Sequence, residues 1–165
     1  MFKHPAIDYE MAERTAATRY GGIGALRALV GALGLDKAIN AGLHLLQIHA
    51  PYFESDQVLN MAYNVASGGT CLEDIERLRQ DESYTDSLDA ERLPDPTTAG
   101  DFLRRFTAEA WLKWQEIFND ARPKVWRQPP AAFRQEAIID ADGIIAGTDG
   151  ECKQGMDIAY TGVWG

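Results

Sequence analysis

The spacing of apolar residues changes once along this 165-residue chain, and that change limits which folds it can adopt. Over residues 24–118, apolar side chains recur every three or four positions between prolines, glycines and capping residues, which predicts a series of short helices. After Glu136, short β-branched and aromatic runs alternate with glycine-containing turns, which predicts three strands in a meander. We therefore expect an α+β chain, with an all-helical region over residues 1–130 followed by the first strands of a second domain over residues 131–165.

Two segments carry clear helix-start signals. Thr70 and Glu73 have the spacing of a capping box, in which each side chain bonds to the backbone N–H of the other residue. Farther along, the prolines of LPDP (93–96) require extended backbone, and Thr97 or Thr98 is expected to cap the short helix that follows. Both segments belong to the predicted helical region.

The chain carries no segment that predicts insertion into a membrane or transport across one. No apolar stretch approaches the ~20 residues of a membrane span. The start, MFKHPAIDYEMAERTAATRY, lacks the charged-then-apolar layout of a secretion signal. Cys71 and Cys152 lie far apart, without the spacing of a metal site. We therefore expect a protein of the reducing cytoplasm with no membrane partner.

The net charge of −9 is unevenly distributed. Residues 51–100 carry eleven acids and three arginines, residues 101–136 carry seven basic residues and five acids, and residues 137–165 carry five acids and one lysine. Because DNA is a polyanion, an acidic chain binds it only through a local basic surface or bound cations. Strong DNA binding by this chain alone is therefore not expected.

Two acids close the first apolar run of the C-terminal region, in EAIIDADGIIAGTDGE (136–151). On a strand, the period of two residues would place Asp140 and Asp142 on one face. A carboxylate at the end of a buried strand is costly unless paired or metal-bound, and hard oxygen ligands suit Mg²⁺ or Mn²⁺. The competing interpretation is structural, because Asp142-Gly143 is also a hairpin-turn signal. On the residues alone, the turn is slightly favoured.

Two other motifs compete for the same acids. An EF-hand loop starting at Asp140 would need glycine at its sixth position, where Ile145 stands, and this excludes it. The segment IIDADGI (138–144) resembles the D-x-D-G-T opening of haloacid-dehalogenase-type phosphatases. Ile144 replaces the threonine of that opening, and the long α/β domain of that fold does not follow. A phosphatase-like metal enzyme therefore stays a remote alternative.

The basic residues of the predicted helical region are candidates for contacts with DNA phosphates. The segment over residues 70–106, two short helices joined by an acidic link, could form a helix-turn-helix-like unit that directs Arg104 and Arg105 toward DNA. Lys124 and Arg127 give the proline-rich connector after it a basic character. The plain alternative, a helical bundle with solvated arginines, is favoured because helix pairs are common.

Three tryptophans in the same region could stack on bases, namely Trp111, Trp114 and Trp126. Aromatic residues at helical spacing are more often part of a hydrophobic core. We therefore predict that these side chains are core residues.

Three pieces of the sequence, taken together, carry a resemblance to a known family. LEDIERLRQD (72–81), LPDPTTAGDFLRRF (93–106) and the D-x-D strand within AIIDADGIIAGT (137–148) occur in the order found in DDE-domain transposases of bacterial insertion sequences. More narrowly, they resemble the group-1 branch of that family. The similarity extends from about Gly21 to the end of the chain.

The resemblance implies a helical N-terminal region followed by a ribonuclease-H-like catalytic domain, here only its first strands. The first catalytic acid of the family lies on the first strand of that domain and matches Asp142, which would be catalytic and a metal ligand with Asp140 as its neighbour. Ile144 stands where threonine is usual. In the family, two Mg²⁺ (or Mn²⁺) ions held by three carboxylates carry out phosphoryl transfer on DNA.

The second aspartate and the glutamate lie far downstream in family members, and this chain ends before them. The resemblance therefore implies DNA transposition by an incomplete transposase whose metals bind only in a complete active site. Its expected partners are the terminal repeats of the element, a second copy, or the full-length transposase. The alternative function is a non-catalytic product of the element that binds DNA or regulates the enzyme.

We expect no strand cleavage or transfer by this chain alone, because one pair of carboxylates holds Mg²⁺ poorly. The measurement is a strand-transfer assay with Mg²⁺ or Mn²⁺ on DNA from the ends of the element. Turnover that disappears in Asp142→Ala would contradict the prediction.

Overall fold

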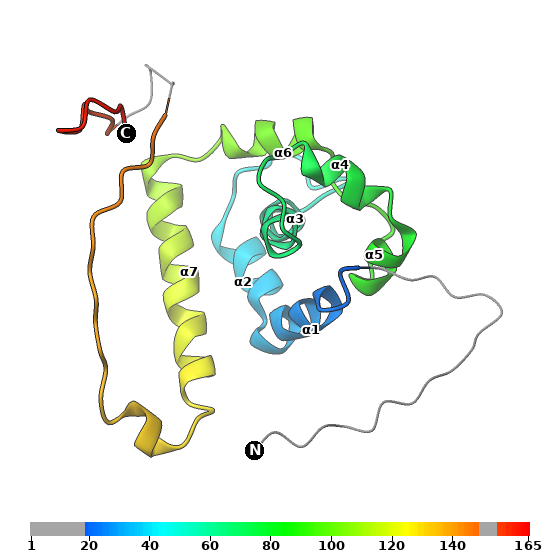
Figure 1. Ribbon diagram of the computed structural model, residues 1–165. Helices are drawn as coiled ribbons and strands as arrows, with labels where there is room; N and C mark the ends of the chain where they lie inside the picture. Colours follow the sequence, from blue (N-terminus) through cyan, green and yellow to red (C-terminus); the bar gives the residue numbers. More distant parts are fainter. Residues whose placement is uncertain (1–18, 149–154) are drawn as a thin grey trace. The chain divides into compact units, whose positions relative to one another are not determined.

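The computed structural model describes residues 19–148 and 155–165 (Figure 1). Contacts between residues divide the chain into two compact units, residues 1–128 and residues 129–165. Each unit is described by itself.

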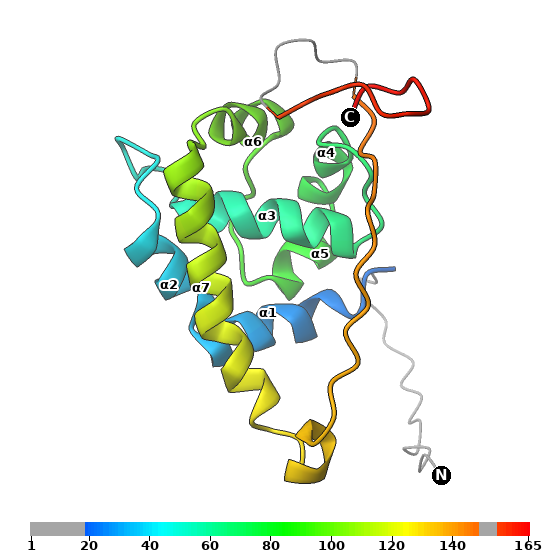
Figure 2. The same cartoon turned by 90° about the vertical axis from the view of Figure 1, so that its left-hand side faces the viewer.

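The first unit is built from helices packed around a central one. Helix α3 occupies the middle, with α2, α4 and α6 packed against it, whereas α1 contacts α2 and α5 (Figure 1). Helix α7, the longest, packs on α2 and crosses in front of α1 and α2 in Figure 2. The helices are α1 Ile23–Leu33, α2 Leu35–Gly42, α3 Glu54–Ala66, α4 Asp74–Arg79, α5 Glu82–Ser87, α6 Pro96–Leu103 and α7 Ala108–Trp126.

Short polar side chains start several of these helices, as the residue types predict. The side chain of Thr107 accepts a hydrogen bond from Ala110 N at the start of α7, and that of Asp81 accepts one from Tyr84 N at the start of α5. Gly34, with a φ of 65°, ends α1 and leads directly into α2. Each cap satisfies backbone groups that the helix itself leaves unpaired.

The two helix starts singled out in the sequence do not have the predicted caps. Asp95 caps α6, since its carboxylate accepts from the backbone N and the hydroxyl of Thr98 at 2.9 and 2.8 Å. The predicted cap, Thr97 or Thr98, was therefore wrong by two or three residues. The reciprocal pairing of Thr70 and Glu73 does not form either, because Asp74 Oδ2 accepts from Thr70 N at 2.8 Å.

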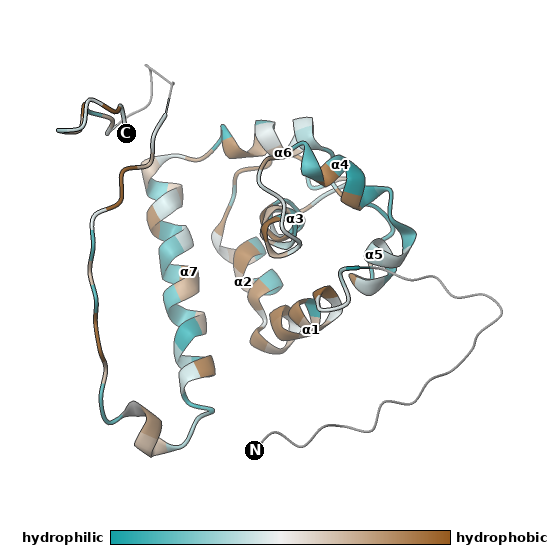
Figure 3. Cartoon of the chain, in the orientation of Figure 1, coloured by the Kyte–Doolittle hydropathy of each residue, from teal (hydrophilic) through white to brown (hydrophobic). Residues whose placement is uncertain are grey.

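Every helix of the first unit contributes at least one buried hydrophobic side chain to its core. Ile39, Tyr84 and Phe102 are among the side chains with almost no exposed surface. Burying a side chain of that size stabilises the fold by about 1.5–3 kcal/mol. Figure 3 shows the hydrophobic residues concentrated on α1 and α2, with more polar residues on α4 and α5.

The turn after α3 depends on a close approach between Asn64 and Gly69. Asn64 is buried, and its Nδ2 donates to Cys71 O at 2.9 Å. A Cβ atom at Gly69 would lie 2.8 Å from Asn64 Nδ2 and closer still to the other end of that amide. Position 69 therefore requires glycine, because a larger residue would overlap the side chain of Asn64.

The second unit contradicts the predicted fold class. It contains one short 3₁₀ helix, Ala131–Arg134, followed by extended backbone, and no strand forms in the part of the chain that the structure describes. The one pairing recorded there is an isolated antiparallel bridge between Ile158 and Trp164. The expected α+β chain with the first strands of a ribonuclease-H-like domain is therefore wrong, and the described fold is helical.

The physical reason is that a β-branched run becomes a strand only when a neighbour pairs with it. Ile138, Ile139 and Ile144 are 91%, 88% and 92% exposed, so these apolar residues neither pair nor pack. The hairpin turn at Asp142-Gly143 does not form as an alternative, because the residues around it are extended. The alternation of residue types therefore predicted strands where none forms in the described residues.

We expect Gly69→Ala to lower the free energy of unfolding by about 1–3 kcal/mol, because the new Cβ displaces the Asn64 amide from its hydrogen bond with Cys71. Gly21→Ala is the matched control, since a Cβ at Gly21 meets no atom within 4 Å. Urea unfolding of both variants measures the difference. Equal stability of the two would contradict the close approach.

Candidate functional site

The two aspartates nominated as metal ligands lie on exposed, extended backbone. Asp142 Oδ1 accepts a hydrogen bond from the N–H of the next residue, Gly143, at 2.8 Å. Asp140 and Asp142 are both exposed to solvent. The strand that was expected to hold them side by side does not form.

This arrangement does not fit a Mg²⁺ or Mn²⁺ site. Among the described residues, no group of three His, Cys, Asp or Glu side chains is placed to hold a metal ion. Two solvated carboxylates leave the ion with its own waters and give it no fixed geometry. Of the other nearby acids, Asp149 and Glu151 lie outside the described residues, and Asp157 accepts from its neighbour Ile158 N.

Arg104 and Arg105, nominated for DNA contacts, follow helix α6 and differ in what they bind. Arg104 is strongly exposed and forms an ion pair of 2.7 Å with the exposed Asp101. Such a surface pair contributes little and exchanges readily with other anions. Arg105 instead donates to Leu45 O at 3.3 Å and so contacts the segment after α2.

Lys124 and Arg127 lie at the end of α7. Lys124 Nζ donates to Leu33 O, the last residue of α1, at 2.7 Å. A cation at the carboxyl end of a helix satisfies a free carbonyl and complements the helix dipole, so Lys124 has a structural role. Arg127 is the C-cap residue of α7 and is exposed. All four nominated cations are exposed, and the structure distinguishes Arg105 and Lys124 by their hydrogen bonds to carbonyl groups of other segments.

The helix-turn-helix-like unit expected over residues 70–106 contains a third helix. Its acidic link folds as α5, Glu82–Ser87, and Tyr84 of that helix is fully buried. The segment thus forms α4, α5 and α6, with α4 in contact with both α5 and α6. The segment is therefore not a pair of helices joined by a short turn.

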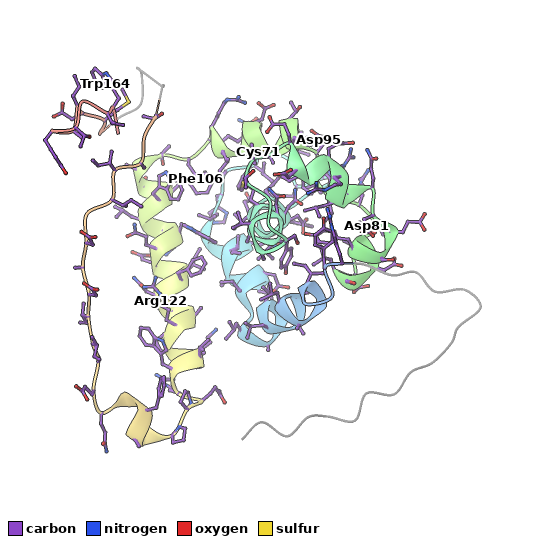
Figure 4. The ribbon with its side chains drawn as sticks, in the orientation of Figure 1. Cys71, Asp81, Asp95, Phe106, Arg122 and Trp164 are labelled. Atoms are coloured by element: carbon purple, nitrogen blue, oxygen red, sulfur yellow. The ribbon has the colours of Figure 1, made fainter. Side chains whose placement is uncertain are left out.

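The prediction that the three tryptophans are core residues is correct for one and wrong for two. Trp114 packs against the core, with its ring 4.6 Å from that of Phe118. Trp111 and Trp126 are 49% and 58% exposed. Both exposed rings belong to α7. Figure 4 shows Arg122 on this helix and Phe106 between α6 and α7.

Sequence reasoning missed Glu54, the most deeply buried acid among the described residues. Its carboxylate is 1% exposed and accepts from the N–H groups of Leu45 and Leu46 at 3.1 and 3.0 Å. His49 Nε2 lies 3.4 Å from the other carboxylate oxygen. The signal available in the sequence was weak, because glutamate is common in the first turn of a helix and its side chain is usually exposed to solvent there.

The environment of Glu54 keeps its carboxylate charged. Burial by itself raises the pKa of the Glu54 carboxyl. The backbone N–H groups of Leu46, Glu54 itself and Leu45, together with the charge of His49, outweigh burial, so that the pKa lies below its ordinary value. A buried charge satisfied in this way is structural, since its acceptor positions are used by the chain itself.

A polar hollow of about 480 Å³ lies beside α3, between α1, α2 and residues 88–94. Two hydrogen bonds from side chains to the main chain fix its rim: the Tyr52 hydroxyl donates to Leu93 O at 3.0 Å and Asn60 Nδ2 donates to Pro94 O at 3.1 Å. Tyr63 lines the hollow, and burial raises the pKa of its hydroxyl. The charged lining residues include both acids and bases, so the hollow favours neither a cation nor an anion.

Comparison with known proteins adds no relative: no family model, no curated protein and no solved structure matches this chain. None of the helices in the described residues is both long and apolar enough to cross a membrane. The transposase resemblance therefore rests on the motifs quoted above.

We expect Glu54→Gln to lower the free energy of unfolding at neutral pH by about 1–3 kcal/mol, because the amide replaces a charged acceptor of two backbone N–H groups. Because the pKa of Glu54 is lower in the folded chain than in the unfolded chain, its stabilising effect is complete above the unfolded pKa. That effect is lost as the pH falls through the folded pKa.

The difference between wild type and Glu54→Gln should therefore shrink below about pH 4.5, in urea unfolding measured from neutral to acidic pH. Glu91→Gln, at an exposed glutamate of the same unit, is the control and should change stability by less than about 0.5 kcal/mol. A difference that stays constant down to pH ~3 would contradict the role assigned to the buried charge.

Proposed function

We propose that this chain acts in DNA transposition as the helical part of a DDE-type transposase. The observation that carries the proposal is the order of the motifs LEDIERLRQD and LPDPTTAGDFLRRF (72–81 and 93–106) ahead of the D-x-D segment. In the structure these two motifs contain α4 and α6, which contact each other and the central helix α3. These two motifs thus belong to one packed module, the first unit.

Within this proposal, the chain performs no phosphoryl transfer by itself. Two-metal transfer needs carboxylates that clamp both ions in a fixed geometry. Asp140 and Asp142 are solvated on extended backbone instead. The proposed setting is the cytoplasm, where the DNA of a bacterial element lies.

A second candidate function, DNA binding without catalysis, is favoured by the placement of accessible cations. Arg104 and Arg127 are exposed in the one part of residues 51–165 whose net charge is positive, residues 101–136. The acids are concentrated in residues 51–100, around α4 and α5. Because two arginines release few counterions, the expected binding is weak and vanishes at moderate salt.

We expect the full chain to bind the DNA that flanks its own coding sequence, where the ends of an insertion sequence lie, more tightly than unrelated DNA. Duplexes of about 40 bp that tile these flanks are tested by fluorescence anisotropy from about 50 to about 200 mM salt. Arg104→Ala and Arg127→Ala should each weaken binding and reduce the salt slope by about 1.

Arg77→Ala is the matched control, because it removes one exposed arginine from the acidic helix α4. It should leave the slope unchanged. Binding that is absent at low salt, or equal on flanking and unrelated duplexes, would contradict site-specific DNA binding. Strand transfer by the chain alone would contradict the non-catalytic role.

A further inference from the structure

The polar hollow beside α3 contains a hydrogen-bond donor that the chain itself does not use. Tyr63 is 6% exposed and lines the hollow, and its hydroxyl has no hydrogen-bond partner among the described residues. Because burial raises the pKa of this hydroxyl, it stays protonated at neutral pH and can donate. A buried polar group without a partner is costly, so the acceptor for this hydroxyl is expected to come from outside the chain.

The charges that act on the Tyr63 hydroxyl are those of Arg27 in α1 and Asp36 in α2, which also line the hollow. Their side chains lie 3.9 Å apart, the long end of an ion pair, and both are partly exposed. Such a pair contributes little, so Arg27 can exchange Asp36 for another carboxylate at small cost. A hydroxyl and an arginine side by side suit a ligand carboxylate, because both donate to its oxygens.

The loop over residues 88–94 gives the hollow an acidic side. Asp89 and Glu91 line the hollow, are exposed, and form no ion pair within the described residues. Asp89 has a φ of 53°, a left-handed conformation that is uncommon outside glycine and often occurs at ligand sites. The hydrogen bonds of Tyr52 and Asn60 to this loop hold it in place. Free carboxylates on a loop fixed in this way suit an ammonium group.

The lining as a whole selects against a ligand with a single charge. Three cations and four acids line the hollow, so a simple anion or a simple cation meets like charges there. A ligand with one charge of each sign avoids this repulsion. Tyr52, Phe53 and Leu59 add an apolar part to the lining, and about 480 Å³ is an ordinary volume for a small-molecule site.

We propose that the hollow binds a free α-amino acid with an apolar side chain. The carboxylate of the amino acid accepts hydrogen bonds from the Tyr63 hydroxyl and from Arg27, and its ammonium group pairs with Asp89. Its side chain lies against Phe53 and Leu59. The proposal does not depend on DNA binding, because none of the four cations nominated for DNA contacts lines this hollow.

A nucleotide fits the same hollow less well, although Tyr52 offers an aromatic ring and Arg92 a cation. The guanidinium of Arg92 already lies over the ring of Tyr52, 5.5 Å from its centre, where a base would stack. The phosphate groups of a nucleotide would also bring more negative charge to the four acids of the lining.

The first experiment is isothermal titration calorimetry of the full chain with L-phenylalanine, up to about 5 mM at neutral pH. The expected dissociation constant is about 0.1–1 mM, because the ligand has few atoms. N-acetyl-L-phenylalanine lacks the ammonium charge, and L-phenylalaninamide lacks the carboxylate. Each should bind at least about tenfold more weakly than L-phenylalanine.

The second experiment repeats the titration on three variants. Tyr63→Phe removes only the hydroxyl and should weaken binding about tenfold. Tyr84→Phe is the matched control and should bind like wild type, since the hydroxyl of Tyr84 is also buried but Tyr84 does not line the hollow. Asp89→Asn removes the charge and keeps a residue that tolerates a left-handed φ, so it should fold and weaken binding about three- to fivefold.

Urea unfolding shows whether each variant folds. Wild type without saturable binding, or Tyr63→Phe that binds like wild type, overturns the proposal. Equal losses in Tyr63→Phe and Tyr84→Phe assign the effect to the fold and also overturn it. Equal binding of L-phenylalanine and its two blocked forms, or tighter binding of AMP, overturns the assignment to an amino acid. Because no DNA is present, failure here is distinguishable from failure of the proposed function.

Discussion

The buried carboxylate of Glu54 is the contact on which the arrangement of the first unit depends. It binds the backbone N–H groups of Leu45 and Leu46, and so holds the segment that leaves α2 against the first turn of α3. Arg105 donates to Leu45 O on the same segment. Glu54 thus fixes the connection between α2 and α3, and Arg105 joins the chain that follows α6 to the same segment.

The same device recurs along α3, where polar side chains bind the main chain of neighbouring loops. Asn60 donates to Pro94 O and Asn64 donates to Cys71 O, and in the reverse direction the side chain of Asn40 in α2 accepts from the backbone N–H of Ser55. All three α3 residues are buried. Each bond satisfies a carbonyl or an N–H that would otherwise be buried without a partner, and each is specific to one position of one loop. Helix α3 therefore sets loop positions through hydrogen bonds, in addition to its apolar contacts.

This use of polar residues explains which parts of the fold could be predicted from the sequence and which could not. The helical region and most of its breaks were predictable, because Gly34, Thr107 and the prolines before α6 act on the chain locally. The structural role of Glu54 was not predictable, because it depends on the segment that contains Leu45, which comes close to Glu54 only through tertiary packing. The strands failed for the same reason: pairing is a property of two segments, whereas a run such as Ala137-Ile138-Ile139 describes only one.

The candidate site shows the same division. The nominated arginines and lysine were found as charges, but only the three-dimensional contacts separate Lys124, which donates to the end of α1, from Arg127, the C-cap residue of α7. Trp111 and Trp126 were assigned to the core because helical spacing does not say which of two apolar sides a helix buries. Helix α7 carries apolar residues on more than one side, and their spacing does not show which side is buried.

The exposed isoleucines around Asp140 and Asp142 give the charges of these two acids a physical effect that does not depend on a metal ion. Ile138, Ile139 and Ile144 sit on extended backbone whose N–H and C=O groups are free to template another strand, which is the usual beginning of fibrous self-association. Two negative charges inside that run place like against like whenever copies align in register. By elementary electrostatics, this repulsion disfavours such in-register alignment.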